Sequence, residues 1–159
     1  MILALDPSIN DVGCAIVDSS GQYVSGSTLK TKGKSTAQKL DSLVAQFSAW
    51  FSQQKNIDTI VIEHTRFFAR QNNQSHASAQ KLNLAKGVLF GLAKSLHPGP
   101  VHLIWMAGFN KDQARLIARA CKLPEKISQH EVDAFWLAYQ WSTATAAKKR
   151  ELIEADLDT

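Results

Sequence analysis

Two short apolar runs in the chain each end in an acidic residue. Residues 2–6 read Ile-Leu-Ala-Leu-Asp, and residues 57–63 carry Ile-Val-Ile directly before Glu63. Continuous apolar runs of this length are typical of strands that are buried on both faces, as in a parallel sheet. The working crevice of an open α/β sheet lies at the carboxyl ends of its strands, so neighbouring strands would bring Asp6 and Glu63 together.

The spacing of apolar residues along the rest of the chain predicts the other elements. Periods of two or of three to four residues, broken by turn residues such as Ser-Ser-Gly and His-Pro-Gly-Pro, separate strands from helices. The further predicted elements are strands at 13–17, 23–29 and 101–106 and helices at about 36–55, 76–96, 110–122 and 128–141. The order βββαβαβαα predicts one α/β domain at 1–145, a five-stranded mixed sheet flanked by helices, with a charged tail at 146–159.

Composition narrows the class of protein. A chain of 159 residues with 45% apolar and 20% charged residues is ordinary for one soluble globular domain. Its longest apolar stretch is far shorter than the roughly 20 residues that span a bilayer, and we expect no membrane partner. The N-terminus lacks the features of a signal peptide, and Cys14 and Cys121 lie in apolar segments. We therefore expect buried, reduced thiols in a cytoplasmic setting.

Basic residues are unevenly distributed. The formal net charge is +4, but the last nine residues contain four acids, so residues 1–150 carry 18 basic against 10 acidic residues. Residues 64–122 hold nine Lys or Arg and a single acid, Asp112. A basic surface beside an acidic crevice fits a polyanion whose backbone reaches the acids. Solvated helix faces are the simpler alternative interpretation.

His130 and Asp133 extend the candidate site. They lie three residues apart near the start of a predicted helix, so their side chains share one face. A surface histidine and an aspartate favoured by the helix dipole are the simpler interpretation of this pair. Glu131 is offset from Asp133 by about 200°, and we expect it to be solvated. Carboxylates held close together favour a cation between them, and hard oxygen ligands suit Mg²⁺ or Mn²⁺.

The order of these residues along the chain resembles that of the RuvC-type Holliday junction resolvases, which belong to the retroviral-integrase/ribonuclease H superfamily. The resemblance covers most of residues 1–141 and depends on order and spacing more than on any single motif. The segments that carry it are ILALDPSINDVGCAIVD, IDTIVIEHTRFFARQN, SAQKLNLAKGVLFGLA, FNKDQARLIARACKLP and HEVDAFWLAYQW. It implies a ribonuclease H-like fold in the single α/β domain.

The resemblance also implies roles for individual residues. Asp6, Glu63 and Asp133 fall on metal-binding carboxylates of the family, and His130 falls on a fourth position that many members fill with an acid. Lys111 matches a basic residue that helps to engage the scissile strand, so the implied catalytic set is Asp6, Glu63, His130, Asp133 and Lys111. The candidates for binding nucleic acid, some of them in the loop that reaches the junction centre in the family, are Arg66, Phe67, Phe68, Arg70, Lys81, Lys111 and Arg115.

The implied activity is a metal-dependent endonuclease that resolves Holliday junctions by paired phosphodiester hydrolysis as a homodimer. Each site would bind two Mg²⁺ ions, for which Mn²⁺ would substitute. The enzyme would act in DNA recombination and repair in the cytoplasm of a bacterial or phage-infected cell, and an organellar source remains an alternative. The helix at 76–96 has a second apolar face that includes Leu84 and Val88, and this face is the predicted dimer interface.

Other functions remain open at this point. A related nuclease could act on other branched DNA or on RNA, and a non-catalytic nucleic-acid-binding module could keep the same fold. A proofreading-type exonuclease is disfavoured, because it needs Asp-x-Glu where this chain has Asp6-Pro7-Ser8. An actin-like sugar kinase needs two such domains and Gly-rich phosphate loops, for which a chain of 159 residues has no room.

Overall fold

The computed structural model describes residues 1–64, 76–105 and 111–154, and residues 76, 111 and 154 by their backbone alone. The predicted order of strands and helices is confirmed, and a further helix follows it. The strands are β1 (Ile2–Asp6), β2 (Asp11–Val17), β3 (Tyr23–Lys30), β4 (Thr59–Glu63) and β5 (Val101–Ile104). The helices are α1 (Thr36–Phe51), α2 (His76–Leu96), α3 (Lys111–Ala120), α4 (Gln129–Thr143) and α5 (Ala146–Glu154).

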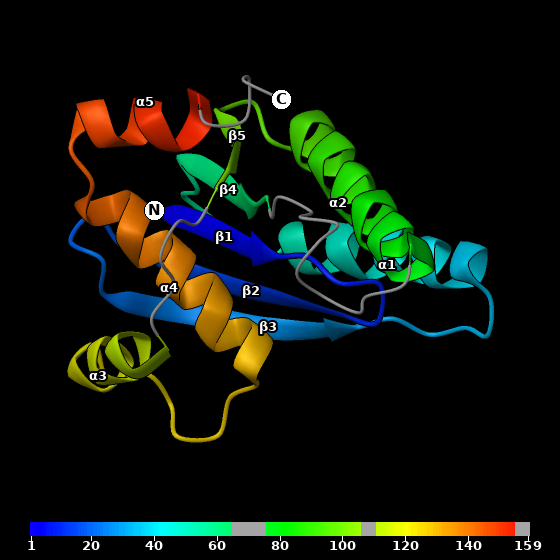
Figure 1. The fold of residues 1–159 in the computed structure, drawn as a ribbon, viewed down its shortest axis with the longest axis horizontal. Helices are drawn as coiled ribbons and strands as arrows, with labels where there is room; N and C mark the ends of the chain where they lie inside the picture. The colour runs from blue at the N-terminus through cyan, green and yellow to red at the C-terminus, as the bar shows by residue number, and fades with distance from the viewer. Residues whose placement is uncertain (65–75, 106–110, 155–159) are drawn as a thin grey trace.

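The strands form one five-stranded mixed sheet in the order β3-β2-β1-β4-β5. β1 pairs with β2 in antiparallel register, whereas β1 with β4 and β4 with β5 are parallel. A parallel neighbour requires a crossover, and α1 supplies it between β3 and β4. The predicted α/β class and mixed sheet are therefore confirmed, and β1, β4 and β5 end at the same edge (Figure 1).

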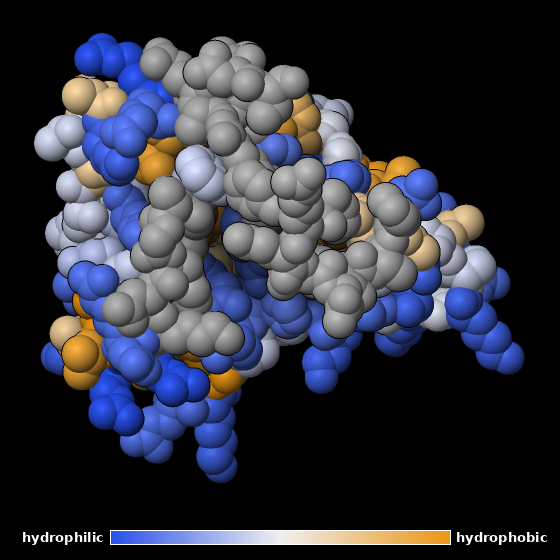
Figure 2. All heavy atoms as spheres, viewed as in Figure 1, coloured by the Kyte–Doolittle hydropathy of each residue, from blue (hydrophilic) through white to orange (hydrophobic). Residues whose placement is uncertain are grey.

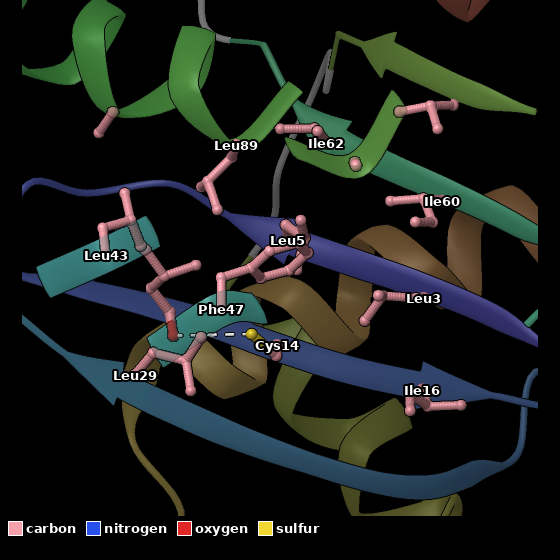
Figure 3. Close-up of a cluster of buried hydrophobic side chains, with 14 residues drawn as sticks. Leu3, Leu5, Cys14, Ile16, Leu29, Leu43, Phe47, Ile60, Ile62 and Leu89 are labelled. Atoms are coloured by element: carbon pink, nitrogen blue, oxygen red, sulfur yellow. Dashed lines mark hydrogen bonds between the residues drawn. The ribbon is translucent and has the colours of Figure 1, made fainter. Parts of the chain in front are cut away.

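One face of the sheet packs on α1 and α2. Alternate residues of the strands point to this face, as period-two strands require. Leu43 and Phe47 of α1 and Leu89 of α2 meet them, and Figure 3 shows these side chains converging over β1 and β2. The fully buried strand residues of this cluster include Leu3, Leu5, Cys14, Ile16, Ile60 and Ile62.

The opposite face packs on α4, which crosses in front of β1, β2 and β3 in Figure 1. The strand residues beneath the centre of α4 are small, namely Ala4 and Ala15. Their small side chains leave room for Phe135 of α4. Gly13 in β2 permits the closest approach, because a Cβ at this position would collide with the carbonyl group of His130. The start of α4 is thus held against the carboxyl end of β1.

Helix starts follow the predicted caps, and the tail is ordered as a helix. Ser35 forms a capping box with Gln38 at the start of α1, and the Ser128 hydroxyl accepts from the Glu131 amide at the start of α4. Leu152 of α5 is buried, and its carbonyl accepts from the Trp105 amide at 3.3 Å. The boundary drawn between domain and tail at residue 145 stays a prediction.

The surface is mainly hydrophilic on the side seen in Figure 2, where hydrophobic side chains form separate small patches. Within the described ranges, no helix combines the length and apolar character needed to cross a membrane. Cys14 and Cys121 are both free and buried, as predicted.

Candidate active site

Asp6 and Glu63 occupy adjacent positions at one edge of the sheet. Leu5 of β1 lies opposite Ile62 of β4 in parallel register, so the residue that follows each of them is an acid at the strand end. The Asp6 side chain is only 13% exposed. The apolar runs fix both strands in the core, and each therefore delivers a carboxylate to the same place.

The acids act on one another electrostatically. Burial raises the pKa of Glu63 to about 8, with the charge of Asp6, a hydrogen bond to Asp6 and the charge of Asp133 adding to the shift. Lys86 lowers this pKa, but it does not offset the other effects. Glu63 therefore holds a proton more tightly than an ordinary carboxyl group, because it is largely buried and two further carboxyl groups act on it.

His130 reaches the site from the first turn of α4. Its Nδ1 lies 2.6 Å from Oδ2 of Asp6, and its side chain is 39% exposed. A carboxylate oxygen can only accept, so Nδ1 carries the hydrogen and Nε2 is the nitrogen left for another partner. The contact joins residues that are 124 positions apart in sequence, and the close packing at Gly13 makes it possible.

Asp133 completes the set from the next turn of α4. Its Oδ1 accepts a hydrogen bond from Nε2 of Gln129 at 2.8 Å. Its charge contributes to the raised pKa of Glu63, which places it within electrostatic reach of the strand-end acids. Asp6, Glu63, His130 and Asp133 thus lie at one edge of the sheet.

The residue types of this site suit a hard divalent cation. Three carboxylates and an imidazole are ligands that Mg²⁺ or Mn²⁺ accepts, and a cation would offset the repulsion between acids that contributes to the raised pKa of Glu63. The side chains are paired with each other rather than arranged around a common point. Accordingly, in the ranges that the structure describes, no three His, Cys, Asp or Glu side chains form a ready-made ligand set.

Sequence reasoning missed Lys86, which is buried on α2 beside the acids. Its Nζ lies 2.7 Å from Nδ1 of His64, the residue after Glu63, and its charge favours the ionised form of Glu63. A signal was present in the sequence. Lys86 falls between Ala85 and Leu89 in the stripe of α2 that packs on the sheet, where a lysine needs a partner.

Comparison with known proteins was made by sequence and by structure. No protein-family model and no curated protein sequence matches the chain. A Thermus thermophilus RuvC structure matches with a TM-score of 0.68 at 19% identity, over 87% of this chain and 90% of that one. This chain has the RuvC fold.

A second solved structure matches in the same way. It is the T. thermophilus RuvC in complex with a Holliday junction substrate, with a TM-score of 0.68 and 18% identity. The match covers 91% of this chain and 97% of that chain. The predicted ribonuclease H-like architecture is therefore confirmed over nearly the full length of both proteins.

Glu131 is not solvated, and that expectation was wrong. It is a buried residue of α4, and its Oε1 accepts a hydrogen bond from the Tyr23 hydroxyl at 2.6 Å. The helical offset from Asp133 was sound, but in the RuvC-like fold the other side of this turn faces the sheet. Gly26 of β3 leaves the space, because a Cβ there would collide with Glu131 Oε1.

The structure describes only some of the residues that were predicted to contact nucleic acid. Arg66, Phe67, Phe68 and Arg70 lie outside the described residues. Lys111 begins α3, and only its backbone is described. Lys81 is exposed on α2, where it lines a groove beside the loop after β1, and Arg115 is exposed on α3. Their roles stay predictions.

Proposed function

We propose that this chain is a metal-dependent endonuclease that cuts branched DNA, with four-way junctions as its substrate. The observation that carries the proposal is the gathering of Asp6, Glu63 and Asp133 at the strand ends, where burial and neighbouring charges raise the pKa of Glu63 to about 8. Three acids held close together repel one another and so do not stabilise the fold. The arrangement therefore favours a function that uses their combined charge.

The residues of the site would have different roles. Asp6, Glu63 and Asp133 would hold the ions through carboxylate oxygens, and His130 would contribute Nε2 while Asp6 orients its ring through Nδ1. Mg²⁺ or Mn²⁺, when bound, supplies an activated water and charge stabilisation for phosphodiester hydrolysis. Lys86 would keep Glu63 ionised once its proton has left, because its charge already favours that form.

The choice of substrate rests on likeness and on charge. One of the matching structures is a RuvC in complex with a Holliday junction substrate, and the match spans 91% of this chain. The net charge is +4, and residues 64–122 hold nine Lys or Arg against one acid, a balance that favours a polyanion. Related branched DNA and RNA are the competing substrates.

A cleavage assay tests the proposal. Labelled four-way junction, flap, linear duplex and RNA are incubated with Mg²⁺, with Mn²⁺ and with EDTA. Wild type should cut the junction at paired sites only with metal, and Asp6→Asn should lose at least about 100-fold in rate while it still binds the junction. Asp41→Asn, an exposed acid of α1, is the matched control and should cut normally.

Three results would contradict the proposal. Cleavage by Asp6→Asn at the wild-type rate would show that the acids are not needed for cleavage. Cleavage without metal would show that the ions are not needed either. Faster cutting of RNA than of any DNA would leave a nuclease with a different substrate.

We also infer a homodimer formed through the outer face of α2. Leu84 is 49% exposed there, and at Gly87 and Gly91 an added Cβ would have no neighbour within 4 Å. Small residues beside an exposed leucine suit close approach of a second helix. Two sites related by a two-fold axis would match the two equivalent cleavage points of a junction.

The dimer has its own test. Leu84→Glu should give monomers in sedimentation and unpaired cuts in the junction. Val24→Glu is the control, because Val24 is equally exposed but lies on the edge strand β3. A Leu84→Glu protein that remains dimeric rejects this interface.

A further inference from the structure

A groove of about 370 Å³ is lined in part by the loop that follows Asp6. Three segments that are distant in sequence form it: the loop after β1, the connection into α1, and the second turn of α2. The polar residues that line it are Ser8, Asn10, Lys34, Thr36, Lys39, Ser78 and Lys81. Figure 2 shows hydrophilic side chains at the lower right edge of the molecule, where the connection into α1 lies in Figure 1.

The charge of this groove has one sign. Lys34, Lys39 and Lys81 line it, and no acid is among its lining residues. In the part of the chain that the structure describes, none of these lysines forms an ion pair with a carboxylate. Positive charges that share a groove repel one another, so an anion placed between them is favoured.

The polar lining fits the same ligand. The Lys39 amine donates to the side-chain carbonyl of Asn10, which ties α1 to the loop after β1 and fixes one wall. The hydroxyls of Ser8 and Thr36 add uncharged donors. Gln38 accepts from the amides of Lys34 and Ser35, so the attraction for an anion comes from the lysine side chains rather than from those amides.

The position of the groove relates it to the acids. Ser8 follows Asp6 by two residues in the same loop. Lys81 precedes Lys86 by five residues on α2, about 7.5 Å along a helix axis, and Lys86 acts on Glu63. Two segments that carry residues of the site therefore also form the walls of the groove.

We propose that this groove is a separate phosphate-binding subsite, which holds a backbone phosphate of the nucleic acid next to the phosphodiester at the acids. The inference rests on the proposed function in that the chain must bind nucleic acid. A strand that brings one phosphate to Asp6 and Glu63 carries neighbouring phosphates past the groove. Three lysines and hydroxyl donors bind the backbone irrespective of sequence, and the subsite fixes the register of the strand.

Binding measured without metal tests the subsite. A fluorescent four-way DNA junction is titrated with protein in EDTA at 50 to 200 mM NaCl. Lys34, Lys39 and Lys81 are replaced together by Gln, which keeps most of each stem. The control triple replaces Lys55, Lys94 and Lys149, two exposed lysines and one half-buried lysine, as in the groove set, none of which lines the groove. Thermal melts check that both triples are folded.

The expected result is a change in salt dependence. One lost phosphate contact should flatten the slope of log affinity against log salt by about 0.9, so the groove triple should lose about one unit of slope and bind about 10-fold more weakly. The control triple should keep the wild-type slope. Equal slopes and affinities for the two triples would overturn the subsite, as would failure of wild type to bind the junction.

The outcome is separable from the nuclease proposal. Binding in EDTA does not depend on cleavage, and Asp6→Asn should keep the wild-type salt slope. If Asp6→Asn cuts normally while the groove triple loses its slope, the metal-site proposal falls and the subsite stands. If the groove triple keeps its slope while Asp6→Asn loses cleavage, the subsite falls and the nuclease proposal stands.

Discussion

The acid site and the lysine groove are opposite in charge and alike in one respect. Asp6, Glu63 and Asp133 gather negative charge at the strand ends, while Lys34, Lys39 and Lys81 gather positive charge around the neighbouring groove. Each set gathers charges that repel one another, and each favours a counterion from outside. They differ in the backbone that holds them. The acids are attached to strands and a helix that pack in the core, whereas the lysines are attached to segments at the surface. Changes in the core should therefore damage the acid site and leave the lysine groove intact.

Gly13→Ala should separate the two regions most strongly. The added Cβ would collide with the His130 carbonyl, so α4 must move away from the strands and take His130 and Asp133 with it. Overpacking of this kind should cost about 3 kcal/mol of unfolding free energy, measured by urea melts, and junction cleavage should drop at least about tenfold.

Gly87→Ala, made in the Leu84→Glu background because Gly87 lies in the proposed dimer face, is the stability control for that change. No atom lies within 4 Å of an added Cβ there, and alanine should stabilise the helix by about 0.5–1 kcal/mol.

Salt-dependent DNA binding by Gly13→Ala should stay near wild type, since the groove does not use α4. A stable, fully active Gly13→Ala protein would contradict the packing argument.

The pH dependence of stability should come from the acid site. The pKa of Glu63 is raised to about 8 in the folded protein from an ordinary value of 4.5, so the native state binds the extra proton. The metal-free protein should therefore lose stability as pH rises from about 4.5 to about 8, by on the order of 2 to 4 kcal/mol.

Two variants sharpen this prediction. Glu63→Gln cannot ionise and should flatten the pH profile of thermal melts in EDTA. The groove triple, with Lys34, Lys39 and Lys81 replaced by Gln, should keep the wild-type profile. A wild-type protein that gains stability between pH 5 and 8 would reverse the sign and contradict the assignment.

Tyr23→Phe tests the support beneath the site. It removes the donor to the buried Glu131, which should cost about 1–3 kcal/mol of unfolding free energy. Tyr139→Phe, on the same cluster of aromatic rings, should cost less because no hydrogen bond to Glu131 is lost. Equal melting temperatures for the two variants would show that the Tyr23–Glu131 bond adds nothing.

The smallest effect is expected from the groove itself. Replacing its three lysines with Gln relieves repulsion between two exposed charges and one half-buried charge, which is worth about a few tenths of a kcal/mol at low salt. The melting temperature should rise by about 1 °C in low salt and not at all in 0.5 M NaCl, where screening is strong. A fall in melting temperature at low salt would mean that the lysines stabilise the fold instead.

Much of the fold was predictable because its signals are local. The strand-end acids Asp6 and Glu63 were predicted from the apolar runs before them, and the start of α4 from Ser128 and the His130–Asp133 spacing. The metal site itself stays a prediction. Arg66, Phe67, Phe68 and Arg70, which were expected to contact DNA, lie outside the described residues.

What the sequence did not predict depends on contacts between distant segments. Glu131 was expected in solvent, and only the glycine at position 26 of β3 hints at the space that receives it. Lys86 was hidden in a stretch rich in basic residues. The groove joins segments about 70 positions apart, from Ser8 to Lys81, and no local pattern marks three such segments as neighbours.

Mn²⁺ binding tests the central claim most directly, because it needs neither DNA nor cleavage. Calorimetric titration at pH 8 should show up to two Mn²⁺ ions taken up per wild-type chain, with uptake lost or weakened at least about tenfold in Asp6→Asn and in Asp133→Asn. The groove triple should bind the ions as wild type does. Equal Mn²⁺ uptake by wild type and Asp6→Asn would contradict the claim that these acids hold the ions.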